Sequence, residues 1–261
     1  VRWSDQESAA DWTPTATNTA GGVRVNSGSA IVGAVQTRQE ILIWTDTSLH
    51  SMRFVGAPFI FQFTTLSTDV AMISPNAAVN ARGNVFFMDK TGFYIYNGAV
   101  QQLPCSVQDY VLSNINMSQA FKVFAAENNA FSEIIWFYPV GSGTPDITNY
   151  VSYNYAENVW AVGTLARGGW LDSGVLNGPV GSSVVTDTDT NYLYSHESGY
   201  DDDGSAMTAY IESGDLEIGD GERFTMIDRV VPDFSFSGDV DEASIAMTIK
   251  GSNFPLETAS S

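Results

Sequence analysis

The chain has 261 residues, of which 44% are hydrophobic and 12% aromatic, and its 30 acidic and 11 basic residues give a net charge of −19. This composition is typical of a globular protein and excludes disorder along the whole chain. The acidic excess argues against direct phosphate binding, which needs a footprint of lysine and arginine, whereas it permits calcium or a basic partner. The single cysteine, Cys105, excludes an intrachain disulfide and a zinc site made of cysteines.

The ends of the chain predict a fragment of a longer protein. There is no initiator methionine, and the first residues have no apolar stretch of the kind found in a signal peptide. The longest apolar runs are far shorter than the ~20 residues that cross a bilayer, so we expect no membrane insertion. Residues 1–22 are polar with two tryptophans, and we interpret them as an N-terminal connecting segment.

The first half of the chain is rich in short runs of β-branched and aromatic residues, which predict strands. These runs are Val23–Val25, Ile31–Gln36, Ile41–Trp44, Leu49–Val55, Phe59–Leu66, Ala77–Ala81, Val85–Asp89 and Phe93–Tyr96. Thr45–Ser48 predicts a hairpin turn, and Asn97-Gly98 predicts a type I′ turn. The alternation of Phe59, Phe61 and Phe63 predicts that one face of their strand is buried.

Helix is expected only between Ser106 and Glu127. Ser106 and Asp109 have the spacing of a capping box, and we favour strand again from Lys122. Further strands are predicted at Ile134–Tyr138, Tyr150–Tyr155, Tyr192–Tyr194, Phe224–Phe236 and Ile245–Lys250, with a turn at Thr186–Asn191. Acidic residues cluster between Glu197 and Glu222, so we interpret residues 201–261 as an acidic loop and strands of an adjoining β element.

A repeat organises the strands between residues 23 and 200. Trp44 and Phe87 are 43 positions apart, and the intervals from Phe87 to Trp136 and from Trp136 to Val185 are both 49. A period of this size with about four short strands per unit is typical of a β-propeller blade. The sequence therefore predicts an all-β fold, with propeller-like repeats of four-stranded blades, a short helical insertion and part of a second β element.

Motifs of catalysis are not found, and we predict that the chain is not an enzyme and has no cofactor. It has no nucleophile elbow and no nucleotide-binding glycine motif, and its two histidines, His50 and His196, are most simply a surface strand residue and a strand-end residue. Asp201 could begin a calcium loop with Glu212 at its twelfth position, but Ala206 stands where glycine is needed. Turn chemistry explains these acids equally well, and we predict no metal ligand.

Tryptophan is enriched at protein interfaces, and three tryptophans lie in segments that are not predicted strands. We therefore select Trp3, Trp12 and Trp170 as candidate contact residues. The loops Gly141–Pro145 and Gly199–Gly204 are further candidates for contacts between subunits.

Several segments resemble a known family in their content and order. They are Arg2–Asp5 with Asp11–Pro14, Gln36–Asp46, Ser74–Ala77, Leu103–Cys105, and Tyr153–Tyr155 with Trp160. The chain resembles the tail nozzle, or tail tubular protein B, of short-tailed bacteriophages, together with the related phage stabilisation proteins. The resemblance extends from Arg2 to Leu165, and its motifs are structural.

The resemblance implies a structural virion protein in the phage tail. Such a subunit would form a homohexameric ring that continues the DNA-ejection channel, docks on an adaptor ring protein and supports a fibre or plug protein. The genome would pass without specific binding, because an acidic lumen repels phosphate within a Debye length of ~8 Å. We select Asp201, Asp202 and Asp203 as candidate channel-facing acids.

Two alternatives remain open at this point. A carbohydrate-binding or glycan-hydrolysing propeller would show converging carboxylates, at least one with a raised pKa, beside exposed aromatic rings. A secreted calcium-dependent adhesin is disfavoured by the lack of a leader and of disulfides.

Overall fold

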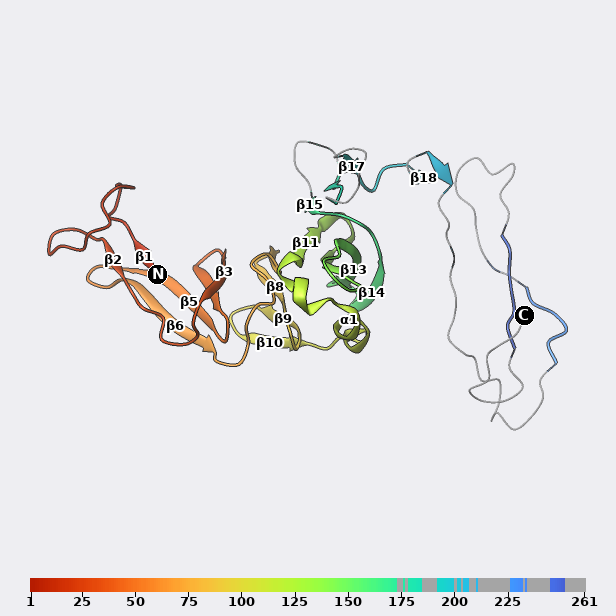
Figure 1. Cartoon of the computed structure of the whole chain (residues 1–261), viewed down its shortest axis with the longest axis horizontal. Coiled ribbons are helices and arrows are strands. Elements are labelled where there is room, and N and C mark those ends of the chain that lie inside the picture. Colours follow the sequence, from red (N-terminus) through yellow and green to blue (C-terminus); the bar gives the residue numbers. More distant parts are fainter. Residues whose placement is uncertain are drawn as a thin grey trace. The chain divides into compact units, whose positions relative to one another are not determined.

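The computed structural model describes residues 1–172, 176, 178–184, 192–199, 201–202, 204–206, 210, 226–231, 233 and 245–251. The chain divides into two units, Val1–Gly199 and Tyr200–Ser261, and each is described by itself (Figure 1). Strands predominate among the described elements, and the regular helices are short. The predicted all-β class is therefore confirmed. None of the helices in the described residues has the length and apolar character to cross a membrane.

The first sheet is an antiparallel meander of four strands in chain order, drawn in orange in Figure 1. Its strands are β3 (Ile31–Gln36), β4 (Glu40–Thr45), β5 (Leu49–Gly56) and β6 (Ile60–Ser67). The predicted turn after β4 is confirmed, since the Thr45 amide donates to the Ser48 carbonyl at 2.8 Å. The predicted burial of Phe59 is wrong: its side chain is 77% exposed, because it lies beyond the last pair of the hairpin, Gly56 with Ile60.

A small N-terminal hairpin accompanies this sheet. Its strands β1 (Arg2–Trp3) and β2 (Gly21–Gly22) pair antiparallel. The predicted strand Val23–Val25 is wrong, because the pairing ends at Gly22. Gly21 is required by its neighbour, since a Cβ atom there would lie 2.4 Å from the Trp3 ring.

The second sheet is again a four-stranded meander. Its strands are β7 (Ala78–Ala81), β8 (Asn84–Asp89), β9 (Gly92–Tyr96) and β10 (Val100–Leu103). The turn between β9 and β10 differs from the prediction, because a type I′ turn needs positive φ at both central residues. Only Gly98 has a positive φ, and the loop contains three residues between the paired Tyr96 and Val100.

The helical insertion follows, as predicted, with α1 (Gln108–Asn114) and the 3₁₀ helix η1 (Met117–Lys122). The predicted capping box is wrong, since the N-cap is Val107 and no side chain caps the helix. The expected strand from Lys122 begins later, at Phe124, because η1 occupies the residues up to Lys122.

The third sheet contains β11 (Phe124–Asn128), β12 (Glu133–Pro139), β13 (Ile147–Asn154) and β14 (Val159–Thr164), with the 3₁₀ turn η2 (Asn129–Phe131) between the first two. A three-stranded fourth sheet follows, with β15 (Gly169–Leu171), β16 (Val180–Ser182) and β17 (Leu193–Ser195). Thr186–Asn191, the predicted turn before β17, lies outside the described residues.

In the second unit, β18 (Asp201–Asp202) pairs with β19 (Ser205–Ala206). The predicted strand Ile245–Lys250 is wrong, because its backbone joins no sheet ladder among the described residues. The same holds for residues 226–231 of the predicted strand Phe224–Phe236, and most of the remainder of that strand lies outside the described residues.

The first strands of the four sheets lie side by side. β7 lies next to both β3 and β11, and β15 lies next to β11. Backbone contacts support this row, since the amide of Ala125 donates to the carbonyl of Asn76 at 2.8 Å just before β7. Sheets that meet through their first strands and extend outward through the next three are arranged like the blades of a propeller.

The repeat predicted from the sequence marks equivalent positions in the sheets. Trp44, Phe87 and Trp136 lie in β4, β8 and β12, the second strand of each sheet, and all three are fully buried in one apolar core. The rings of Trp44 and Phe87 meet edge to face at 5.2 Å. The fourth position of the repeat, Val185, lies outside the described residues.

Candidate functional site

Trp3 makes its contacts with residues of the same chain. Its side chain is half-buried, and its Nε1 donates to the Thr19 carbonyl at 2.8 Å. The ring packs edge to face on Phe61 at 5.2 Å and stacks on Phe63 at 6.1 Å. Trp3 therefore holds the N-terminal hairpin on β6.

The other two selected tryptophans have different surroundings. Trp12 is 45% exposed, and its Nε1 donates to the Ala9 carbonyl at 2.8 Å, so its ring remains open to a partner. Trp170 is half-buried in β15, its ring packs at a tilt against His196 with 4.6 Å between the ring centroids, and its Nε1 donates to the Glu127 carbonyl at 3.2 Å. No ring contact among the described residues joins any two of the three tryptophans.

The selected acids lie in the second unit. Asp201 and Asp202 form β18, while Asp203 and the possible twelfth ligand Glu212 lie outside the described residues. The Asp201 carboxylate accepts from the Gly204 amide at 3.3 Å, which is turn chemistry of the kind expected for an acid in a hairpin. Their assignment to a channel stays a prediction.

His50 is buried in the first sheet, whereas His196 is half-buried and directly follows β17, the strand-end position predicted for it. His50 is only 5% exposed, so the prediction of a surface residue is wrong. Its Nε2 lies 2.8 Å from the hydroxyls of both Ser27 and Ser48, and Nδ1 lies 3.2 Å from the hydroxyl of Thr65. Burial lowers its pKa. Ser48 is fully buried, so this serine–histidine contact is a satisfied polar group in the sheet, out of reach of a substrate.

An aromatic-floored hollow of about 300 Å³ lies between the second and third sheets. Its lining includes Arg82, Phe86, Tyr153 and Tyr155. Phe86 and Tyr155 stack at 6.1 Å, and the Arg82 guanidinium lies over the Tyr155 ring, 5.2 Å from its centroid. The hollow therefore combines flat apolar surface with a cation at its rim, as sites for sugars and small organic ligands often do.

A carboxyl group adjoins this hollow. Tyr155 donates its hydroxyl to Glu127 at 3.4 Å. Burial raises the pKa of Glu127, and the charge of Asp172 raises it further, against the opposing effects of Tyr155 and Arg82. Arg82 also donates to the side chain of Asn129 at 3.3 Å. A carboxyl group with a raised pKa can hold a proton nearer neutral pH, as a general acid must.

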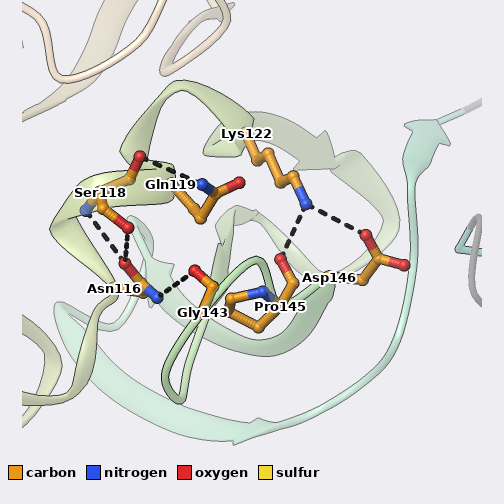
Figure 2. A network of polar contacts seen from close by, with 7 residues as sticks. All are labelled: Asn116, Ser118, Gln119, Lys122, Gly143, Pro145 and Asp146. Carbon is orange, nitrogen blue, oxygen red and sulfur yellow. Dashed lines mark hydrogen bonds and ion pairs between the residues drawn. The ribbon is translucent and has the colours of Figure 1, made fainter.

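The loop between β12 and β13, which we selected for subunit contacts, is fixed by η1 (Figure 2). The side-chain Nδ2 of Asn116 donates to the Gly141 carbonyl at 2.8 Å, and its Oδ1 accepts from the backbone amide of Ser118 at 3.0 Å. The Lys122 ammonium donates to the Pro145 carbonyl at 2.8 Å and contacts Asp146 at 3.2 Å. The loop is therefore presented in a defined shape.

An apolar surface that sequence reasoning missed lies at the tip of the β5–β6 hairpin. Phe54 is 67% exposed, Val55 45% and Phe59 77%. We call these three residues the hairpin tip. Large apolar side chains grouped in the open typically mark contact surfaces. For Phe59, the alternation with Phe61 and Phe63 predicted a buried strand face, so its apolar signal was assigned to the core, and Phe54 and Val55 were predicted only as the end of a strand.

No protein-family model matches the chain, and no curated protein matches it either. Among the described residues, no group of three or more histidine, cysteine, aspartate or glutamate side chains is arranged to hold a metal ion. The hollow could not be found from spacing, because Arg82, Glu127 and Tyr155 come from three separate hairpins. Only tertiary structure brings them together.

Proposed function

We propose that the chain is a structural virion protein of a bacteriophage tail, a subunit of the ring-shaped nozzle that forms the distal DNA-ejection channel. Its sequence resemblance between Arg2 and Leu165 supports this assignment. The observation that carries it is the row of first strands β3, β7, β11 and β15, from which successive sheets extend. Such a repeat is a rigid scaffold that presents its loops and hairpin ends for assembly.

The hairpin tip is the best candidate for a contact between subunits. Phe54 and Phe59 each expose more than half of their surface, and burying such side chains stabilises an interface by about 1.5–3 kcal/mol each. The exposed Trp12 is a second candidate. The proposed partners are further copies of the chain in a hexameric ring, an adaptor ring protein and a fibre or plug protein.

The charge of the chain suits a conduit. With a net charge of −19, a lumen lined by part of its surface would repel the phosphates of passing DNA. In this proposal Asp201, Asp202 and Asp203 contribute to the lining. Asparagine at all three positions should slow DNA ejection or make it sensitive to salt, and normal ejection by this variant would overturn their role.

The decisive experiment is the mass of the purified full-length protein, alone and with its adaptor, together with class-averaged images. Sixfold rings with an open channel are expected. Phe54→Ser with Phe59→Ser should abolish the rings or weaken them at least tenfold, while the matched control Phe131→Ser, at a residue 52% exposed, should assemble normally. A monomer that assembles with nothing would contradict the proposal, whereas rings in the double variant would contradict only the contact.

A second candidate function, carbohydrate binding or glycan hydrolysis, is favoured by the hollow beside Arg82, Tyr155 and Glu127. It predicts binding to a member of a panel of bacterial surface polysaccharides. Arg82→Ala and Tyr155→Ala should abolish that binding, and Arg53→Ala, at another exposed arginine, should leave it intact. Release of reducing sugar that disappears in Glu127→Gln would identify a hydrolase. No binding across the panel would exclude this candidate.

A further inference from the structure

Three residues with side-chain oxygens lie where the third sheet adjoins the fourth. Asn128 ends β11 and faces Glu133, the first residue of β12, as a register pair. Glu197 follows β17 in the fourth sheet, and its carboxylate accepts from the Asn128 Nδ2 at 3.0 Å. Residues 69 positions apart are thus joined by one hydrogen bond between two sheets.

The amide of Asn128 is incompletely bonded. The side chain is only 2% exposed, and its Oδ1 has no hydrogen-bond partner. A buried polar atom left in this way costs about 1–3 kcal/mol. Flipping the side-chain amide would still leave its oxygen without a donor, because the oxygen would then face the Glu197 carboxylate, which also accepts. The carbonyl oxygen therefore requires a donor or a cation.

Both carboxylates are neighbours of Asn128, Glu197 through the hydrogen bond and Glu133 through the β11–β12 pairing. Burial raises the pKa of Glu133, and the negative charge of Glu197 raises it further. Burial also raises the pKa of the Tyr150 phenol, as do the charges of Glu133 and Glu197. Two carboxylates of like charge are thus grouped around a buried amide whose oxygen has no hydrogen-bond partner: Glu197 bonds its nitrogen, and Glu133 is its neighbour across the β11–β12 ladder. A positive charge here would relieve both the repulsion and the unbonded oxygen.

We propose that Asn128, Glu133 and Glu197 bind a divalent cation, with Ca²⁺ preferred, that links the third and fourth sheets. Carboxylate and amide oxygens are the ligands that hard cations select, and Ca²⁺ accepts irregular geometry with water in its remaining positions. Glu197 is exposed, which gives the ion a path of entry, while Asn128 supplies a buried anchor. The site has two acids and an amide, and none of its three residues lines the hollow.

The test begins with protein freed of metal by a chelator and then titrated with Ca²⁺ or Mg²⁺ in a calorimeter. Binding of Ca²⁺ and a higher melting temperature are expected, with a weaker response to Mg²⁺. Tb³⁺ bound at the site should luminesce when tryptophan is excited, because the Trp170 ring packs against His196, the residue before Glu197. Glu133→Gln and Glu197→Gln should each weaken Ca²⁺ binding by about tenfold or more. Glu157→Gln, at an exposed glutamate in the β13–β14 turn, is the matched control and should bind normally.

Three results would overturn the cation site: no heat or luminescence on titration, binding that survives both glutamine variants, or equal loss in Glu157→Gln. Circular dichroism of each variant would show whether it remains folded. If acid stabilises the chelated protein while Ca²⁺ does not, and Glu133→Gln reproduces that gain, then a protonated Glu133 donates to Asn128 instead. That outcome also rejects the cation.

Discussion

The core of the first three sheets and the junction between the third and fourth sheets are built by different means. The core is a continuous apolar cluster in which Trp44, Phe87 and Trp136 are fully buried. The junction, which we call the seam, contains Glu127, Asn128, Glu133, Trp170, His196 and Glu197. The core owes its stability to buried apolar area, which does not titrate and is not subject to ionic screening, whereas the seam depends on charges and hydrogen bonds that pH and ionic strength can alter.

The largest effect should come from the core. Trp136→Ala removes a fully buried ring that contacts Phe93 at 4.9 Å and donates to the Ala77 carbonyl at 3.1 Å. We expect a loss of about 3–5 kcal/mol in the free energy of unfolding, measured by chemical denaturation. Trp12→Ala, at an exposed tryptophan, should change it by less than about 0.5 kcal/mol. Similar losses in both variants would break the comparison.

The seam should respond less and more locally. Trp170→Ala removes a half-buried ring and its bond to the Glu127 carbonyl, so we expect a loss of about 2 kcal/mol. Hydrogen exchange should increase in β15, β16 and β17 while the amides of β8 stay protected, since local opening follows the density of buried contacts. Uniform loss of protection across β8 as well would show that seam and core unfold as one unit.

The core contains a buried hydroxyl group that a single substitution can remove. The Tyr138 hydroxyl is buried without a partner, and burial raises its pKa to about 12. Tyr138→Phe removes the unbonded hydroxyl and keeps the ring, so the melting temperature should rise, corresponding to a gain of about 1 kcal/mol. A clear loss of stability would mean that this hydroxyl is bonded in solution.

The smallest expected effect comes from the charge of Glu133 in the seam. Folding raises the pKa of Glu133, so the native state holds the proton more tightly than the unfolded state, and stability falls as pH rises above the ordinary glutamate pKa. In chelator, Glu133→Gln should therefore be more stable than the parent at pH 7, by less than about 1 kcal/mol after screening. The gain should disappear at pH 4. A gain that persists there would not be electrostatic.

The sequence predicted the parts of the fold that local pattern controls. The spacing of Trp44, Phe87 and Trp136 marked equivalent strands, because each aromatic side chain must enter the same core at the same strand of its sheet. His50 was misjudged because its partner Ser27 comes from a loop more than twenty residues earlier. The contacts of Arg82 with Asn129, and of Asn128 with Glu197, likewise join distant segments and leave no trace in local periodicity.

Each of the first three sheets is made from one uninterrupted stretch of chain, covering residues 31–67, 78–103 and 124–164. Its strands pair in chain order, so the loops that must close between partners are short and cost little entropy. Chains dominated by contacts between near neighbours fold faster than chains that depend on distant pairings. During synthesis, each sheet therefore has all of its hydrogen-bonding partners before the next one leaves the ribosome, and exposed strand edges are short-lived.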